Sequence, residues 1–541
     1  MEQLTSANAS SDPTDPSSSS DVATEAARRR TFAIISHPDA GKTTLTEKFL
    51  LYAGAVLQAG AVKARAGTRH ARSDWMEMEQ QRGISITSAV MQFTYRDHVV
   101  NLLDTPGHRD FSEDTYRVLA AADAAVMVLD VAKGIETQTR KLFEVCRARH
   151  LPILTFLNKY DRPGRDPIEL MDEIEQQIDL RATPVTWPVG IPGDFRGVVD
   201  RRNGSFIRYA RTAHGTTAGS EETVDPHRAE TEEGDAWRRA IDECALLEGV
   251  GADLDIPSFL AGDSSPLFVG SALTNFGVRH LLDAIVDMAP SPTARLGTDG
   301  AYRPVGSAFS GFVFKKQANM DPGHRDHVAF VRVCSGRFER SMSVTHEPTG
   351  KPFTTKYAAT MFGASRSTVD EAYPGDILGL VNAGDLRIGD TLYAGKPVAY
   401  PPIPSFPPEL FATAHARDNS RHKQFRRGLE QLEHEGVIQV LRDPEGDPTP
   451  VLGAVGAMQF EVASHRLEHE FGARTDIEPA PYKAIRITDA PTAKRLRSSA
   501  GIRVLVRRDG TLVALFESDY RLTRLRNDNP AWCLEPLETA I

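Results

Sequence analysis

The first residues that could do chemistry form a small polar loop between an apolar segment, 31–36, and a segment with apolar residues at helical spacing, 43–52. The loop reads Ser36, His37, Pro38, Asp39, Ala40, Gly41, Lys42, Thr43 and Thr44. Backbone N–H groups of such a loop and a helix N-terminus hold phosphate, a lysine reaches the phosphate oxygens, and a threonine hydroxyl binds Mg²⁺. Ser36 stands where the usual pattern has glycine, so a chance Gly-Lys-Thr remains the alternative for this loop alone.

A second polar motif follows the apolar segment 99–103. It comprises Asp104, Thr105, Pro106, Gly107 and His108. An aspartate at a strand end can hold Mg²⁺, usually through water, and a glycine lets a backbone N–H approach a terminal phosphate. Alone, this motif would be an ordinary turn. Downstream of a phosphate-binding loop, it predicts a sensor of the γ-phosphate.

The third motif, Asn158, Lys159, Tyr160 and Asp161, predicts which base is bound. The Asp161 carboxylate can accept hydrogen bonds from the N1–H and the exocyclic amine of guanine, a donor pair that adenine lacks. We expect Asn158 to hydrogen-bond the base and the loop, and the Lys159 stem to pack on the base. A weaker fourth motif, with Ser271 and Ala272 after Gly270, could offer its backbone to the guanine oxygen.

These motifs need a sheet that brings them to one edge. Apolar segments at 99–103, 124–129, 153–157 and 267–270 are each followed by polar loops, and helical patterns recur between them. Such runs are typical of strands covered on both faces. The sequence therefore predicts a multidomain α/β protein whose P-loop domain has a parallel-type sheet.

Changes in composition divide the chain into further units. We expect a disordered tail at 1–28, a GTP-binding domain at 29–290 with an insertion near 185–262, a β-barrel domain at 305–398 and a C-terminal α+β domain at 405–541. The barrel is indicated by short alternating segments separated by glycine, and the last domain by mixed helical and extended patterns.

The 541-residue chain is long enough for three or four domains, and 40% hydrophobic with 25% charged residues is typical of a protein with several cores. No apolar stretch approaches the roughly 20 residues of a membrane span, which predicts a cytoplasmic protein without a membrane partner. The four cysteines form no metal-binding or disulfide pattern. A net charge of −10 does not exclude nucleic acid, because local patches decide that.

Together the motifs resemble those of the translational GTPases, and more narrowly those of the peptide chain release factor 3 family. The general resemblance extends to Ser73, Asp74, Trp75, Met76, Glu77, Met78 and Glu79, and to Arg82, Gly83, Ile84, Ser85, Ile86 and Thr87, which match the family's first switch. The narrower resemblance rests on 36–44, 311–322 and 371–380. It weakens in the insertion and beyond about residue 480, and leaves out the tail.

The resemblance implies GTP and GDP as ligands and Mg²⁺ as the metal, held by Thr43, Asp104 and Ser85. Many relatives have threonine where Ser85 stands, and Thr87 is the alternative ligand. By the same resemblance His108 is the catalytic residue that orients water. We expect slow hydrolysis until a ribosome presses this switch into place.

The implied function is a ribosome-stimulated GTPase of translation termination that promotes dissociation and recycling of the stop-codon-reading release factors. Its partners would be those factors and the ribosome, both rRNA and ribosomal proteins, and the protein would be a monomer. One alternative is a GTP-gated ribosome-associated binding module. Another is a translocase-like elongation factor, which the chain length disfavours. Asn158 and Asp161 oppose an ATP-dependent enzyme.

Overall fold

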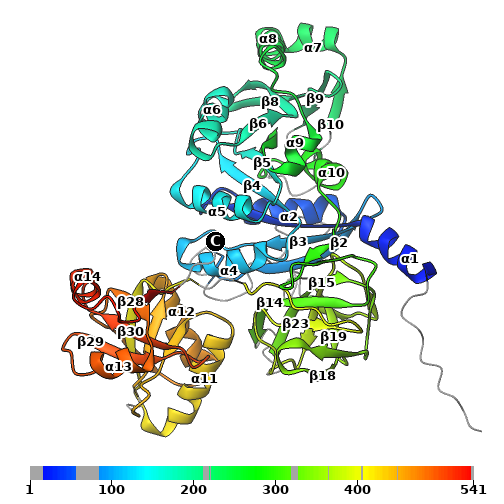
Figure 1. Ribbon diagram of the computed structural model, residues 1–541. Coiled ribbons are helices and arrows are strands. Elements are labelled where there is room, and N and C mark those ends of the chain that lie inside the picture. The colour runs from blue at the N-terminus through cyan, green and yellow to red at the C-terminus, as the bar shows by residue number, and fades with distance from the viewer. Residues whose placement is uncertain are drawn as a thin grey trace, which may run out of the picture.

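The computed structural model describes residues 16–55, 79, 85–210, 219, 221–318, 327–362, 365–403, 406–446 and 449–537. An α/β unit with an appended small sheet occupies the top and centre of Figure 1, a barrel lies below it, and the C-terminal part lies beside the barrel. The motifs of the predicted nucleotide site all lie in the α/β unit.

The sheet of the α/β unit has the strand order β2-β3-β1-β4-β5-β11-β6. Its strands are β1 (Arg29–Ser36), β2 (Ala89–Tyr95), β3 (His98–Asp104), β4 (Ala124–Asp130), β5 (Ile153–Asn158), β6 (Arg181–Pro184) and β11 (Ser264–Val269). All neighbours pair in parallel except β2 and β3, which form an antiparallel pair. The predicted parallel-type sheet is thus confirmed, with one antiparallel edge strand.

Helices cover both faces of this sheet. They are α2 (Lys42–Tyr52), α4 (Ser112–Leu119), α5 (Thr137–Ala148), α6 (Pro167–Ile178), α9 (Ile256–Ala261) and α10 (Val278–Met288). Along β1, Phe32 and Ile34 join the core that contains α2 and α10, whereas Ala33 and Ile35 join the core that contains α4, α5 and α6. Because side chains alternate along a strand, a nearly continuous apolar run serves both cores.

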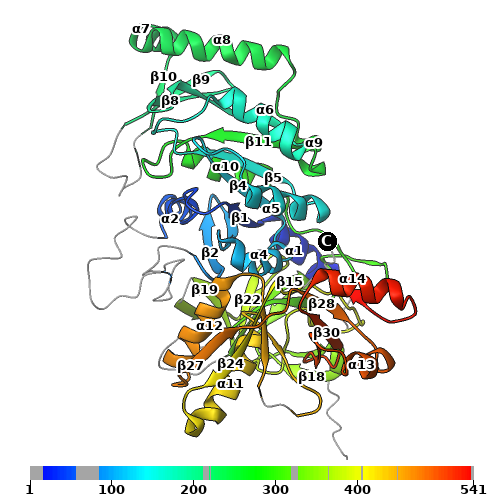
Figure 2. The ribbon, with the colours of Figure 1, turned by 90° about the vertical axis from the view of Figure 1, so that its left-hand side faces the viewer.

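A small antiparallel sheet is inserted between β6 and β11. It consists of β7 (Thr186–Ile191), β8 (Asp194–Asp200), β9 (Ser205–Tyr209) and β10 (Glu221–Val224), and is followed by α7 (Pro226–Glu233) and α8 (Asp235–Gly249). Trp187, Phe206 and Trp237 form the centre of its own core. Figures 1 and 2 show α7 and α8 at the end of the molecule farthest from the barrel.

The first helix corrects part of the predicted disordered tail. Residues 1–15 lie outside the described chain, but Pro16–Ala27 form helix α1. Val22 and Ala26 are buried, and Glu25 forms ion pairs with Arg28 and Arg29. The polar composition of this segment concealed two apolar side chains at i and i+4, which are enough to give a docked helix one buried face.

The barrel has the strand order β18-β17-β23-β14-β15-β22-β19. Its principal strands are β14 (Ser310–Ala318), β15 (His327–Ser335), β17 (Ser343–His346), β18 (Lys351–Thr354), β19 (Ala358–Phe362), β20 (Ser365–Thr368), β22 (Ile377–Val381) and β23 (Thr391–Tyr393). Two short pairs accompany them: β12 (Arg295–Leu296) with β13 (Tyr302–Arg303), and β16 (Phe338–Glu339) with β21 (Glu371–Ala372). A bridge between Phe362 and Met91 joins β19 to β2, so one sheet runs from the α/β unit into the barrel.

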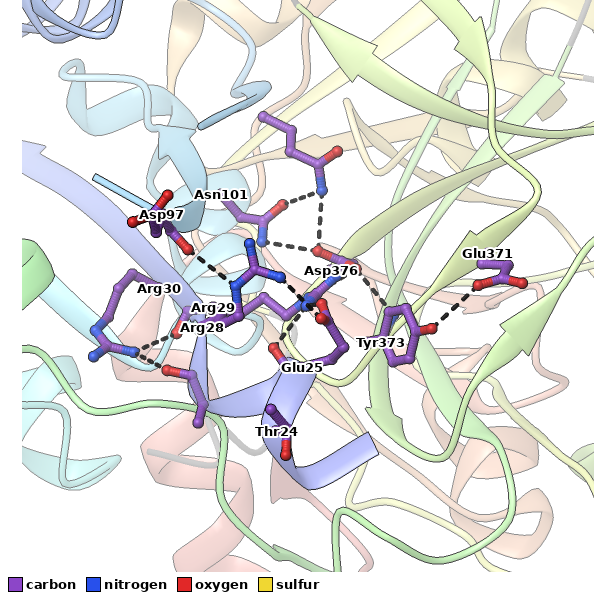
Figure 3. Close-up of polar contacts among 12 residues, drawn as sticks. Thr24, Glu25, Arg28, Arg29, Arg30, Asp97, Asn101, Glu371, Tyr373 and Asp376 are labelled. Atoms are coloured by element: carbon purple, nitrogen blue, oxygen red, sulfur yellow. Dashed lines mark hydrogen bonds and ion pairs between the residues drawn. The ribbon is translucent and has the colours of Figure 1, made fainter. Parts of the chain in front are cut away.

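A buried polar network fixes the barrel against β1 and β3 (Figure 3). The Asp376 carboxylate accepts hydrogen bonds from Arg29 Nε at 3.1 Å, from Gln92 Nε2 at 3.0 Å and from the backbone N of Tyr373 at 2.9 Å. The Arg29 guanidinium also lies over the Tyr373 ring, 4.7 Å from its centroid. These contacts explain why the 371–380 motif is needed: its turn carries the carboxylate that pairs with Arg29.

The C-terminal part, predicted as one α+β domain, contains two four-stranded sheets. The first has β24 (Leu410–Ala416), β25 (Gln439–Leu441), β26 (Val451–Ala454) and β27 (Thr475–Pro479), with helices α11 (His422–His434) and α12 (Ala457–His469). The second has β28 (Ala484–Ile487), β29 (Ile502–Val506), β30 (Leu512–Phe516) and β31 (Glu535–Pro536), with α13 (Ala490–Leu496) and α14 (Asp519–Asp528). Phe411 and Leu441 of the first share a core with Ile485 and Leu515 of the second.

Within the described part of the chain, no helix combines the length and the apolar character that a membrane crossing requires. The four cysteines are free thiols, with Cys146 and Cys334 buried. Burial raises the pKa of the Cys146 thiol to about 12.

Candidate functional site: a phosphate loop and a base-binding edge

The phosphate loop connects the end of β1 to the start of α2. Two of its residues have left-handed backbone conformations, Asp39 with φ 64° and Gly41 with φ 98°. A Cβ at position 41 would lie 2.3 Å from Asn158 Nδ2. Only glycine therefore fits at this position, because it satisfies both the backbone angle and the close approach of the asparagine.

A cavity of about 310 Å³ lies over this loop. It is lined by Ser36, His37, Pro38, Asp39, Gly41, Lys42, Thr43, Thr44, Ser85, Gly107, His108, Lys159 and Arg162. Residues from three of the four sequence motifs thus meet at one site. Arg162, which the sequence analysis did not single out, adds a cation at its rim.

The two motifs that were predicted to hold phosphate and metal are in direct contact. Lys42 Nζ lies 2.8 Å from Asp104 Oδ1, and both side chains are buried. Their contact follows from the sheet, since β1 and β3 are parallel neighbours whose carboxyl ends converge. The lysine and the aspartate are therefore held together at the floor of the loop.

Two hydroxyl groups lie side by side next to this pair. Thr43 Oγ1 and Ser85 Oγ are 3.5 Å apart. The Thr87 hydroxyl instead donates to Glu79 Oε1 at 3.3 Å, and the same oxygen accepts from the backbone N of Ile86 and Thr87. Hydroxyl and carboxylate oxygens are the donors that Mg²⁺ prefers, so the residues present fit that ion. Of the predicted first switch, only Glu79 and 85–87 belong to the described residues.

Asn158 connects three segments of the site. Its Nδ2 donates to Ala40 O at 2.7 Å, and its Oδ1 accepts from the backbone N of Ala272 at 2.8 Å. The amide is buried, so both hydrogen bonds are shielded from water. In this structure Asn158 organises the loops around the base-binding edge, as the sequence analysis expected for the loop contact.

The Asp161 carboxylate provides a buried acceptor with no assigned protein donor. Its Oδ1 is buried and has no hydrogen-bond partner among the described residues. A buried carboxylate oxygen without a donor is costly, so it marks a place where a ligand N–H would be favourable. This is the atom that was predicted to read guanine.

Lys159 has a partner that the sequence analysis missed. Its Nζ lies 2.8 Å from Asp130 Oδ2, at the end of β4, and its backbone has φ 69°. Burial acts to raise the pKa of Asp130, but the hydrogen bond of Lys159, the backbone N–H of Ala132 and the charge of Lys159 together outweigh it, and the pKa is lowered. The available signal was positional, because Asp130 ends an apolar strand just as Asp104 does.

Several predicted site residues support the loops from behind rather than facing the cavity. The Tyr160 side chain is 1% exposed and packs edge-on against Phe195, with ring centroids 5.0 Å apart. The Thr105 hydroxyl donates to Ile34 O at 2.6 Å. Ala40, Pro106 and Ser271 are likewise buried. Of the residues predicted to bind nucleotide, these can act only through the backbone or by holding the loops in place.

His108 lies at the start of the short helix η2 (Arg109–Phe111) and lines the cavity. Its side chain is 33% exposed, and its Nδ1 accepts a hydrogen bond from the backbone N of Asp110 at 3.2 Å. Gly107 beside it packs closely on Pro38, because a Cβ at 107 would lie 3.4 Å from Pro38 Cα. His108 is thus held by its own helix at the edge of the phosphate loop.

His37, in contrast, is almost completely buried. Burial lowers the pKa of its imidazole, although Glu136, with Oε2 3.8 Å from His37 Nδ1, acts in the opposite direction. The ring is therefore neutral near pH 7 and adds no charge to the phosphate loop.

Three family models match separate parts of the chain. Residues 27–291 match the elongation factor Tu GTP binding domain, residues 308–395 match elongation factor G domain 2, and residues 400–526 match the C-terminal domain of class II release factor RF3. Together these matches cover most of the chain.

Curated relatives match across nearly the whole length. Peptide chain release factor 3 of Microcystis aeruginosa is 50% identical over 510 residues, which cover 93% of this chain and 94% of that protein. The protein of the same name from Gloeobacter violaceus is 50% identical over 523 residues, covering 94% and 97%. A crystal structure of a Thermus thermophilus protein has the same fold, with a TM-score of 0.68 at 24% identity over 86% of this chain and 69% of that one.

Proposed function

The chain belongs to the peptide chain release factor 3 family, and from this we propose that it acts on terminating ribosomes as a GTPase whose cycle promotes dissociation and recycling of the stop-codon-reading release factors. It is a guanine-nucleotide-binding enzyme that converts GTP and water to GDP and phosphate, and it interacts with the ribosome. Loss of the γ-phosphate would release the two switch segments and so change the affinity of the protein for the ribosome. The output of the cycle is therefore a conformational change.

One observation supports this proposal most strongly: the loops around Asn158 and the buried Asp161 oxygen form a guanine-reading edge next to the phosphate loop. The Asp161 carboxylate would accept the paired N–H donors of guanine. The amide of Asn158 would keep the phosphate loop and the Ser271–Ala272 turn at a fixed separation.

Hydrolysis requires charge neutralisation on the phosphates and a placed water. Lys42 would neutralise charge at the β- and γ-phosphates, and Gly107 would offer its backbone N–H to the γ-phosphate. His108, on the cavity wall, would orient the attacking water. The side chain reaches the cavity from η2, and movement of that helix would therefore move the catalytic group.

Mg²⁺, when bound, would neutralise charge on the phosphate oxygens. The neighbouring hydroxyls of Thr43 and Ser85 support these two as its ligands, with Asp104 acting through water. The engagement of the Thr87 hydroxyl with Glu79 favours Ser85 over Thr87.

Ribosome contact would rest on rRNA phosphates and ribosomal proteins, with the protein acting as a monomer. Exposed cations of η5 (Asn419–Arg421) and α11 support a surface for phosphates. They are Arg421, Lys423, Arg426 and Arg427. Arg417, which lies just before η5, is paired with Asp476, which reduces its availability.

The test measures GTP hydrolysis by the protein alone, with ribosomes, and with ribosomes stalled at a stop codon beside a release factor, for wild type and His108→Ala. We expect ribosomes to accelerate wild type strongly, release-factor turnover to require GTP, and His108→Ala to lose about 10² to 10⁴-fold of the stimulated rate. If ribosomes leave hydrolysis unchanged, the alternative of a GTP-gated binding module replaces this proposal.

A further inference from the structure

Helix α12 of the C-terminal part begins at an N-cap residue that has no side-chain acceptor for the first turn. The first N–H groups of a helix have no partner within the helix and need an external acceptor. The N-cap residue of α12 is Gly456, which has no side chain to supply one. The Gln459 side chain accepts from the backbone N of Val455 and Gly456, as in half of a capping box, and the Gln459 N–H donates to Gly456 O. The N–H of Met458 is left to find an acceptor outside the helix.

The missing acceptor comes from the GTPase domain. Asp110 Oδ2 accepts a hydrogen bond from the backbone N of Met458 at 2.9 Å, which is the second residue of α12. This is the contact that an N-cap aspartate normally makes within its own helix. Asp110 is 8% exposed, so the carboxylate and the helix end meet away from water. The positive end of the helix dipole adds to the attraction.

Glycine at position 456 is required for this contact. A Cβ there would lie 2.0 Å from Asp110 Cγ and 2.4 Å from Asp110 Oδ2. Next to the polar contact, Ile86, Phe111 and Val462 form a small buried cluster. The end of the first switch, helix η2 and α12 therefore meet at one junction.

The same aspartate also holds His108. The backbone N of Asp110 donates to His108 Nδ1 at 3.2 Å. With Nδ1 accepting, the neutral ring keeps its proton on Nε2, so it has no free lone pair for a water proton. For His108 Nδ1 to accept a proton from water, the ring must separate from the backbone N–H of Asp110. That N–H belongs to η2, and the contact between Asp110 and Met458 holds η2 against α12.

We propose that Asp110 is a positioning residue through which α12 restrains His108 in the free protein, so that undocking α12 from Asp110 releases the catalytic histidine. This inference rests on the proposed role of His108. It identifies the C-terminal domain as a brake on GTP hydrolysis, with the interdomain helix cap as its contact. A ribosome that draws α12 away from η2 would lift the brake.

The experiment weakens this contact from each side and measures ribosome-free GTP hydrolysis by the full-length protein at saturating GTP. Gly456→Ala introduces the clashing methyl group from the C-terminal domain, and Asp110→Ala removes the acceptor from the GTPase domain. We expect each to raise the basal kcat about 2- to 30-fold, the range in which losing a helix cap shifts a two-state equilibrium, with KM for GTP unchanged.

Three further variants separate release of His108 from general damage. Asp110→Asn keeps an acceptor oxygen for Met458 and should give a smaller rise than Asp110→Ala. Adding His108→Ala to Gly456→Ala should abolish the rise. Gly384→Ala, in the barrel, places a methyl group in open space and should match wild type.

A basal rate that is unchanged or lowered in both Gly456→Ala and Asp110→Ala overturns the brake, and so does a rise that persists without His108. Damage to folding cannot imitate the expected result, because the expected change is a gain of rate. If His108→Ala alone leaves ribosome-stimulated hydrolysis intact, the proposed role of His108 fails instead. The two failures are therefore distinguishable.

Discussion

Asp161 carries the carboxylate that we propose selects the base. Asp161 Oδ1 is buried without a hydrogen-bond partner in the described structure, and its neighbour Lys159 is turned towards Asp130. The charge of Asp130 thus positions Lys159, while the Asp161 oxygen stays available to accept a hydrogen bond from a ligand. Specificity at such a site comes from the mismatch that a wrong base would leave unpaired.

We predict that Asp161→Asn weakens GTP binding by at least about 100-fold, because an amide N–H₂ replaces one of the oxygens that face two donors. Xanthosine triphosphate carries a carbonyl where guanine has its amine, so the variant should bind it better than wild type does. The affinities of wild type and Asp161→Asn for GTP and for xanthosine triphosphate can be measured by competition of each nucleotide with a fluorescent GDP analogue. Equal losses for both nucleotides would indicate a damaged site rather than altered reading of the base.

Local patterns predicted most of the residues that line the phosphate loop, but neither Arg162 at its rim nor the residues that hold the loops in place. The phosphate loop, Asp104 and the 158–161 motif are read from short contiguous stretches beside apolar strands. Asp110 could not be recognised in this way, since its partner Met458 is 348 residues away in sequence. Asp130 ends a strand like Asp104, but only the fold brings it to Lys159.

At the scale of elements, α10 and β9 fasten the inserted sheet to the GTPase domain. His280 of α10 is buried, and its Nδ1 lies 3.3 Å from the Tyr209 hydroxyl of β9. Burial lowers the pKa of His280, the charge of Glu221 opposes this and that of Arg279 adds to it. The contact therefore favours a neutral imidazole.

This shift predicts a loss of stability in mild acid. In the folded protein the pKa of His280 lies below its value of about 6.5 in an unfolded chain. As pH falls through about 6.5 the unfolded state binds the proton first, so the stability present at higher pH is lost. Wild type should lose about 1 kcal/mol more between pH 7.5 and 5.5 than His280→Gln does, measured by urea unfolding.

His227→Gln supplies the matched control, because His227 is exposed on α7. Its unfolding free energy should follow wild type across the same pH range. A parallel pH profile for wild type and His280→Gln would mean that protonation of His280 costs the fold nothing.

Apolar spacing predicted the main strands and the first helix of the GTPase domain, and each failure has its own cause. The segments 99–103 and 153–157 lie within β3 and β5, and 43–52 lies within α2, because apolar spacing marks them clearly. Helix α1 was missed since two buried side chains in a polar segment give no period. The second C-terminal sheet was not separated from the first because Phe411 and Ile485 share one core, which makes the composition continuous.

At the scale of the whole molecule, the Asp376 network is one of the buried polar contacts that join the GTPase domain to the barrel. Arg29 and Asp376 are 7% and 5% exposed at their side chains, and their pairing joins segments 347 residues apart. Removing one partner of a buried ion pair strands the other charge. The network therefore has more influence on stability than the exposed ion pairs have.

We predict that Asp376→Asn lowers the free energy of unfolding by about 3 to 5 kcal/mol. It should also separate the unfolding of the barrel from that of the GTPase domain, since one of the buried polar contacts between them is weakened. Urea titration followed by far-UV circular dichroism would show one transition in wild type and two in the variant.

Asp370→Asn is the comparison for this variant, because Asp370 pairs with Arg340 at the surface and is 75% exposed at its side chain. Such pairs contribute about 0 to 1 kcal/mol. Equal shifts for the two variants, or a single unchanged transition in Asp376→Asn, would contradict a coupling role for the buried pair.

The position of β11 in the sheet has a consequence for the folding of the chain during its synthesis. β11 lies between β5 and β6, yet the whole inserted sheet is synthesised before it. During synthesis, which proceeds from the N-terminus, one edge of β5 stays unpaired until β11 has been made. The insertion has its own core and can fold during that interval. Ala272 reaches Asn158 only afterwards. A nascent chain should thus acquire guanine binding in one late step, once β11 has closed the sheet.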